Sequence, residues 1–247
     1  MSAGEPPVLL AAVHGTRDPA GMAQLHRLLG LVRRQRPQLT VTHGCLGPAA
    51  PTLAEALARA SGPVVVVPVL LGPGYHLRVD IPGVLRRAGR PHVRTARALG
   101  PDPLLAEALA GRLHQAGLRS PDPATGVVLA AAGSTDPAAA PATRRLARLL
   151  GARLGTPVST AFLGGPAPRP AEAVSRLRRA GRERVALAPC LLAPGDFARR
   201  AAGCGADITG APLGAHPAVA RLILRRYDEA LACPESGRGP LPELIIR

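Results

Sequence analysis

The strongest indication of the fold class is the run Val64-Val65-Val66-Val67-Pro68-Val69-Leu70-Leu71. A continuous apolar run that is rich in β-branched residues is typical of a strand buried on both faces of a parallel sheet. On either side of it, strands expected over residues 8–13, 39–46 and 93–96 alternate with helices expected over 20–34, 53–60, 81–88 and 104–116. This alternation predicts an α/β fold with a mostly parallel sheet.

The same pattern restarts after the turn-rich segment 120–126, so the sequence contains an internal duplication. Strands expected over 127–132, 158–162 and 184–192 alternate with helices expected over 138–150, 171–180 and 218–232, and a short helix is expected after Asp196. Four blocks recur in the same order at a shift of about 118 residues. We therefore expect two homologous domains, residues 1–122 and 123–247, with an irregular tail from about residue 234.

Composition limits the classes of function. The chain has 247 residues, a net charge of +15, 47% hydrophobic and 2% aromatic residues, and every basic residue is Arg. This composition excludes a disordered chain. No apolar run reaches the roughly 18 residues of a membrane span, and no leader peptide is visible, so we expect a cytoplasmic protein with no membrane partner. Arg without Lys is typical of a GC-rich genome. The net charge of +15 can therefore reflect solvated surface arginines, or binding of nucleic acid or of an acidic ligand.

The repeat shows which residues the shared backbone needs. Gly15, Asp18 and Pro19 recur in the second half, at positions 133, 136 and 137. A tight turn from strand to helix explains the glycine, and the start of the following helix explains the other two. These positions therefore carry a structural interpretation.

Two histidines belong to the first half alone. His14 and His76 are replaced in the second half by Ala132 and Phe197. Each histidine follows a predicted strand, and in a flavodoxin-like strand order those two strands are neighbours, so both imidazoles lie at the sheet edge where ligands bind. Two neutral imidazoles there can bind a divalent transition metal or accept protons near neutral pH. The alternative is that each is an ordinary polar loop residue.

Charged residues flank the same edge. The arginines that could bind carboxylates there in bidentate fashion are Arg17, Arg78, Arg199 and Arg200, although a chain with 31 basic residues also places some there by chance. Asp80 could orient His76 or cap the helix expected from residue 81. The helix-entry pattern favours the cap.

Three segments together resemble a known family: 14–19 (HGTRDP), 70–82 (LLGPGYHLRVDIP) and 132–137 (AGSTDP). They resemble the sirohydrochlorin chelatases, in particular the long two-repeat CbiX type, over roughly residues 8–232. The resemblance implies a class II chelatase fold, in which two flavodoxin-like lobes face each other across a cleft. It also implies insertion of a divalent metal ion into sirohydrochlorin without ATP, Fe²⁺ for sirohaem or Co²⁺ for a cobalamin precursor. The metal is then a substrate, and no permanently bound cofactor is expected.

The family's functional histidines carry over to His14 and His76, which would hold the metal and accept pyrrole protons. Family members often carry acidic residues just after the second strand, where this chain has Gly47 and Ala50. An assisting acid must therefore come from elsewhere, with Asp18, Asp80 and Glu55 as candidates. The residues expected to bind the substrate are Arg17, Tyr75, Arg78 and Arg199. Asp18 and Asp80 are expected to support the site.

Because one chain supplies both lobes, we expect a monomer that acts as a pseudo-dimer with one asymmetric site. Fe²⁺ is favoured over Co²⁺, although no residue decides between them. The alternatives are a non-catalytic protein that binds a tetrapyrrole or nucleic acid, and a phospho-transfer enzyme of the histidine-phosphatase type. Base-stacking aromatics are nearly absent, so no nucleic-acid partner is expected. The phosphatase type needs an Arg directly before the first histidine, where Val13 stands.

Overall fold

The structure, a computed structural model, describes residues 5–119 and 124–233. The first lobe contains a parallel sheet in the order β2-β1-β3-β4. Its strands are β1 (Val8–Val13), β2 (Val41–Cys45), β3 (Val64–Pro68) and β4 (Val93–Thr95). Helices α1 (Pro19–Gln35), α2 (Leu53–Arg59) and α3 (Ile81–Ala88) connect them.

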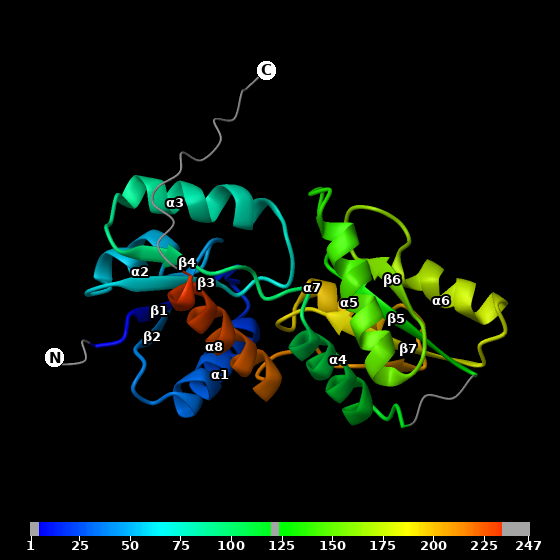
Figure 1. The fold of residues 1–247 in the computed structure, drawn as a ribbon. Coiled ribbons are helices and arrows are strands. Elements are labelled where there is room, and N and C mark those ends of the chain that lie inside the picture. Colours follow the sequence, from blue (N-terminus) through cyan, green and yellow to red (C-terminus); the bar gives the residue numbers. More distant parts are fainter. Residues whose placement is uncertain (1–4, 120–123, 234–247) are drawn as a thin grey trace, which may run out of the picture.

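The second lobe repeats this arrangement, with a parallel sheet in the order β6-β5-β7-β8. Its strands are β5 (Thr125–Ala131), β6 (Val158–Phe162), β7 (Arg184–Cys190) and β8 (Ile208–Thr209). Its helices are α5 (Ala139–Leu154), α6 (Pro170–Arg179) and α7 (Asp196–Ala202). The predicted pair of homologous flavodoxin-like lobes is therefore confirmed (Figure 1).

The last helix of each half covers the sheet of the other half. Helix α4 (Pro103–Gln115) packs against α5 and β7, whereas α8 (Pro217–Ala232) packs against α1 and β3. In Figure 1 the orange α8 accordingly lies beside the blue α1, and the green α4 lies beside α5. The boundary expected between 122 and 123 stays a prediction, and in space the two halves exchange their terminal helices.

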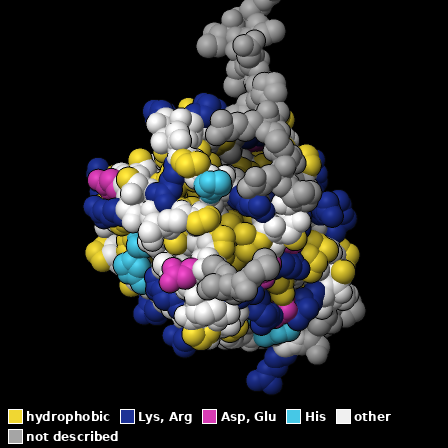
Figure 2. Space-filling model, turned by 60° about the vertical axis from the view of Figure 1, so that its left-hand side comes forward, with side chains coloured by type: hydrophobic (Ala, Val, Ile, Leu, Met, Phe, Trp, Pro, Cys, Tyr) yellow, Lys and Arg dark blue, Asp and Glu magenta, His cyan; other side chains and the backbone are white. Residues whose placement is uncertain are grey.

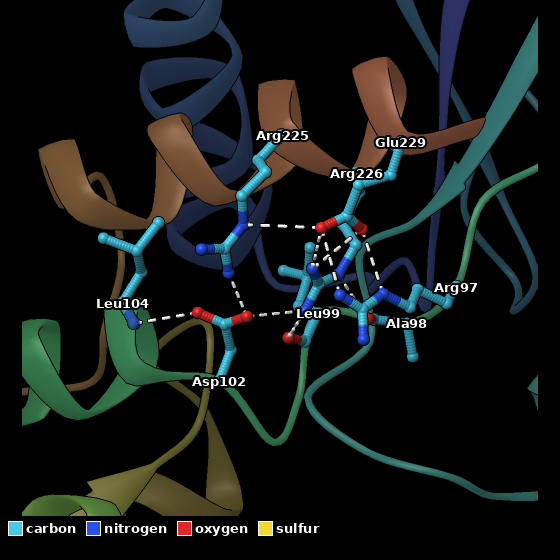
Figure 3. Close-up of polar contacts among 8 residues, drawn as sticks. All are labelled: Arg97, Ala98, Leu99, Asp102, Leu104, Arg225, Arg226 and Glu229. Carbon is cyan, nitrogen blue, oxygen red and sulfur yellow. Dashed lines mark hydrogen bonds and ion pairs between the residues drawn. The ribbon is translucent and has the colours of Figure 1, made fainter. Parts of the chain in front are cut away.

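One arginine on each exchanged helix fastens it to its host lobe. Arg226 on α8 is buried and donates hydrogen bonds to the carbonyl of Leu99 (2.9 Å) and the carboxylate of Asp102 (2.8 Å), as Figure 3 shows. At the matching place on α4, Arg112 donates to the carbonyl of Leu213 at 2.7 Å. These bonds satisfy loop carbonyls that would otherwise be buried without partners. The same device therefore holds both exchanged helices.

The core explains why the central strands read as apolar runs. The valines at 64–67 are at most 1% exposed, because helices cover both faces of β3. On one face, α1 and α8 belong to an apolar cluster that continues through α4 and α5 into the second lobe. On the other face, α2 and the start of α3 close a smaller cluster. The exchanged helices thus lie in a core shared by both lobes.

The remaining expectations about elements differ in detail. The strand expected to reach residue 71 ends at Pro68, because the chain turns there into the loop that leads to His76. The two-residue strand β8 was not expected, since so short a strand has no periodicity to detect. The irregular tail expected from about 234 lies outside the described residues.

The surface bears on the two interpretations of the net charge. Arginine side chains are distributed around the face drawn in Figure 2, between hydrophobic and other polar groups, and do not gather in one patch there. This distribution is typical of solvated surface charge. Within the described part of the chain, no helix has both the length and the apolar character that crossing a membrane requires.

Candidate active site

The turn after β1 places His14 at the carboxyl edge of the sheet. Gly15 adopts φ +77°, and a Cβ on it would come within 2.7 Å of the Cβ of Cys45, so only glycine fits this turn. Asp18 then caps α1 by accepting a hydrogen bond from the amide of Ala20 at 2.9 Å. The predicted structural roles of Gly15 and Asp18 are confirmed.

The segment after β3 places His76 beside His14. A single π-helical turn, η1 (His76–Asp80), precedes α3, and the amide of Ile81 donates to the carbonyl of His76. Because the chain is already helical at Asp80, this residue makes no capping bond, and the expectation that it caps α3 is wrong. Its carboxylate instead contacts Nδ1 of His76 at 2.5 Å. This contact fits the alternative that the sequence left open, in which Asp80 orients His76.

The two histidines and Asp80 form a chain of hydrogen bonds. Nδ1 of His14 lies 2.9 Å from Nε2 of His76, and the ring centroids are 4.8 Å apart. A carboxylate only accepts, so Nδ1–H of His76 donates to it, Nε2 of His76 accepts, and Nδ1–H of His14 donates. Partial burial, and then the neighbouring His76, lower the pKa of His14, which favours its neutral form.

The spacing of the imidazoles suits a metal ion as well as a shared proton. Two nitrogens that each lie about 2.05 Å from an ion are about 2.9 Å apart at a right angle and about 3.3 Å apart at the tetrahedral angle, and Nδ1 of His14 lies 2.9 Å from Nε2 of His76. An ion bound there would replace the proton between the rings. Among the described residues, no group of three or more His, Cys, Asp or Glu side chains is arranged to hold an ion. The pair would therefore leave most coordination positions open.

The imidazole pair faces a cleft of about 770 Å³ between the lobes. From the first lobe, the turn after β1 and the loop after β3 line this cleft, with Tyr75 65% exposed. From the second lobe, the turn after β5, the start of α5 and the loop after β7 line it, with Phe197 41% exposed. The carboxyl edges of both sheets therefore meet at one site, as the resemblance implied.

The predicted substrate-binding arginines lie outside the cleft lining. Arg78 reaches across to the second lobe, where its Nε lies 2.7 Å from the carboxylate of Asp136, a side chain only 6% exposed. Arg199 pairs with Asp196 of its own lobe, and Arg17 is exposed. Of the four residues expected to bind substrate, Tyr75 is thus the one that lines the cleft, and the roles of the arginines stay predictions.

The structure also separates the three candidate acids. Asp18 caps α1, and Glu55 belongs to the capping box at the start of α2, so both carboxylates are engaged away from the histidines. Asp80 alone among them contacts the imidazole pair, through His76. A side chain at Gly47 would come within 2.8 Å of the carbonyl of His14, which explains why no acid stands at that position.

Two other histidines have structural roles. His43 packs against His26 with ring centroids 5.3 Å apart, and partial burial lowers its pKa, in line with the packing role that the sequence favoured. His216 caps α8, because its Nδ1 accepts a hydrogen bond from the amide of Ala218 at 3.2 Å. Neither belongs to the cleft.

Phe197 is an exposed aromatic residue of the cleft that is not among the candidates from the sequence. Two features of the sequence could have indicated Phe197. It occupies the position of His76 in the repeat, and aromatic residues are rare in this chain. Comparison of the repeats identifies the histidine that the second half lacks, and the same comparison identifies the phenylalanine that replaces it.

Two homologous lobes of parallel sheet that face each other across a cleft, with paired imidazoles on one side only, define a class II chelatase architecture. The chain belongs to the CbiX family, whose model matches residues 8–116 and again residues 126–230, one copy for each repeat.

Named relatives come from several organisms. The sirohydrochlorin cobaltochelatase of Priestia megaterium is 28% identical over 199 residues, which cover 76% of this chain and 64% of the relative. That of Methanococcoides burtonii is 30% identical over 82 residues, or 32% of this chain and 63% of the relative. The matches thus span less than two thirds of the length of these curated relatives.

Solved structures share the fold. SirB from Bacillus subtilis with Fe³⁺ superposes with a TM-score of 0.77 at 24% identity, covering 92% of this chain and 96% of SirB. CbiX, described as the terminal enzyme of sirohaem biosynthesis in denitrifying bacteria, superposes with a TM-score of 0.68 at 25% identity, covering 92% and 100%. Both matches span the two lobes of this chain.

Proposed function

We propose that this protein is a sirohydrochlorin chelatase, which inserts a divalent metal ion into the tetrapyrrole without ATP. The observation that carries the proposal is the imidazole pair, with His14 and His76 in contact at 2.9 Å in the cleft between the lobes. Membership of the CbiX family and the names of the curated relatives support it.

In this proposal each group has its own role. Nδ1 of His14 and Nε2 of His76 hold the ion, while the carboxylate of Asp80 keeps the proton of His76 on Nδ1 and leaves Nε2 free to ligate. The macrocycle occupies the cleft and offers its ring nitrogens to the open coordination positions. As the ion passes to those nitrogens, the imidazoles regain their lone pairs and accept the protons that leave the pyrroles.

The carboxylates at the rim of the macrocycle need cationic partners. Arg17, Arg78 and Arg199 lie next to segments that line the cleft, and Tyr75 lies within it. In this proposal the substrate carboxylates compete with Asp136 for Arg78, whose guanidinium is more than half exposed despite the ion pair. Asp18 supports the site indirectly, through the helix that begins behind His14.

The identity of the metal is the finer part of the proposal. We favour Fe²⁺, whereas the curated relatives are named for cobalt, and imidazole accepts both ions. Competition between Fe²⁺ and Co²⁺ for a limiting amount of sirohydrochlorin decides between them. The monomeric state and the cytoplasmic location also stay predictions, and sedimentation of the purified protein tests the first.

The experiment that tests the function is an anaerobic mixture of protein, sirohydrochlorin and Co²⁺ or Fe²⁺. The protein should accelerate the change in tetrapyrrole absorption over the uncatalysed rate, and His14→Ala and His76→Ala should each abolish most of that acceleration. His43→Ala is the matched control, because it removes a half-buried imidazole of the same lobe away from the cleft. Full activity in both site variants would refute the assignment of the site.

A further inference from the structure

The few aromatic residues of this chain gather at the cleft. The sequence contains two Tyr, two Phe and no Trp. Tyr227 is buried, and its hydroxyl donates to the carbonyl of Pro7 at 2.6 Å. The other three line the cleft: Tyr75 and Phe197 are exposed there, whereas Phe162 is only 4% exposed. Exposed aromatic surface that is concentrated in one cavity marks a place where an apolar ligand binds.

Phe197 stands where the first repeat has its metal-binding candidate. It replaces His76, and Ala132 replaces His14, so the second lobe has no imidazole at either position. Phe197 is 41% exposed. It lies on α7, whose buried residue is Ala201, so Phe197 is not the residue that anchors this helix to the core. Core packing therefore does not explain the residue type at this position.

The ring of Phe197 is held in place from behind. The guanidinium carbon of Arg200 lies 5.4 Å from the ring centroid, and Nη2 of Arg200 donates to the carbonyl of Leu163 at 2.7 Å. Gly164 is a second neighbour of the ring. A Cβ added to Gly164 would lie 3.9 Å from Cζ of Phe197, which is van der Waals contact. These neighbours order the ring while one part of its surface faces the cleft.

We infer that Phe197 binds the face of the macrocycle, so that the two lobes divide the work: the first supplies the metal and the second positions the ring. This inference rests on the proposed function. A conjugated macrocycle has a flat apolar face, which gains free energy by stacking on an aromatic ring and losing contact with water. Arg200 acts as a positioning residue, because it orders the ring of Phe197 and does not itself line the cleft.

The test separates binding of the macrocycle from binding of the metal. Phe197→Ala removes the ring, Phe197→Leu keeps an apolar side chain of similar volume, and Val79→Ala is the control because Val79 is equally exposed (39%) but lies outside the cleft lining. Absorbance titration gives the Kd for metal-free sirohydrochlorin, calorimetry gives the Kd for Co²⁺, and steady-state assays give kcat and KM.

We expect Phe197→Ala to raise the Kd and KM for sirohydrochlorin about tenfold, the effect of losing one stacked aromatic contact. Phe197→Leu should show a smaller rise, and Val79→Ala none. Affinity for Co²⁺ should not change in either Phe197 variant, because the imidazoles belong to the other lobe.

Two results would overturn the inference. One is wild-type affinity for sirohydrochlorin in Phe197→Ala and Phe197→Leu. The other is a parallel loss of Co²⁺ affinity, which would show that the residue acts through the fold. If the wild-type protein binds sirohydrochlorin but does not accelerate metal insertion, the proposed function fails while the binding role of Phe197 is still measured. Absence of sirohydrochlorin binding by the wild-type protein refutes both.

Discussion

Asp80→Asn tests how far the carboxylate behind His76 sets the metal affinity of the imidazole pair. The Asp80 carboxylate lies 2.5 Å from Nδ1 of His76, and both side chains are about one-third exposed (33% and 34%). An asparagine fits the same space but carries no charge. It can also donate to Nδ1, which would move the proton of His76 to Nε2, the atom that has to ligate.

The expected effect is a loss of affinity for Co²⁺. Removing a carboxylate behind a ligating histidine costs about tenfold to a hundredfold in metal affinity. Because solvent reaches this pair, we expect the lower end, about tenfold or about 1.4 kcal/mol of binding free energy. Thermal stability should change little, since Asp80 caps no helix, and the change should stay within about 0.5 kcal/mol.

Anaerobic calorimetry with Co²⁺ measures this effect, and Asp196→Asn is the matched control. Asp196 also lines the cleft, but its side chain is 87% exposed and pairs with Arg199, away from the histidines. Loss of its charge tests whether the general electrostatic field of the cleft matters. Wild-type Co²⁺ affinity in Asp80→Asn would refute the reasoning, and so would an equal loss in Asp196→Asn.

Further predictions concern protonation and stability. An NMR titration of the His14 ring should have its midpoint below 6.5, because partial burial and His76 lower its pKa, and a midpoint above 6.5 contradicts the described geometry. Arg226→Met should lower the free energy of unfolding in urea by about 3 kcal/mol because it breaks a buried ion pair, whereas the exposed pair lost in Arg221→Met should cost at most about 1 kcal/mol. Glu229 has its pKa lowered to about 2, first by Arg97, so its stabilising effect is complete above pH 4.5 and is lost as the pH falls towards 2. Glu229→Gln should therefore cost about 1 kcal/mol at neutral pH after allowing for solvent screening, and a cost that persists at pH 2 would show that the charge is not its cause. Burial raises the pKa of the Cys190 thiol to about 12, so thiol reagents should label the exposed Cys233 in the native protein but Cys190 only after unfolding, and rapid labelling of Cys190 itself, located by peptide mapping, would contradict its burial.

The parts of the site that the sequence predicts are those that follow from one strand and its turn. His14 and Gly15 could be placed at the edge of the sheet because a strand, a glycine turn and a helix start follow one another within a few residues. Asp80 could not be assigned, because the choice between a helix cap and a contact with His76 depends on whether the chain is already helical before residue 81. The π-helical turn settles that choice, and no pattern in the sequence announces it.

Contacts between the two lobes are harder still to predict from the sequence. Arg78 looks like a free cation in the sequence, yet its guanidinium lies against Asp136 of the other repeat. The exchange of α4 and α8 has the same origin. Each lobe offers an apolar face to an amphipathic helix, and the periodicity of α4 and α8 does not record which of the two faces each helix covers.

By itself, the sequence determined that this protein has two homologous α/β lobes and that a histidine pair belongs to the first of them. Buried strands, helix periodicity and a repeat are properties of short segments, and the sequence records them directly. The tertiary structure alone decided that the terminal helices are exchanged, that Asp80 supports His76, and that Phe197 faces the imidazoles' cleft from the other lobe. Those features depend on which loops meet in space, and side chains far apart in the sequence become partners only when both sheets bring their carboxyl edges to one cleft.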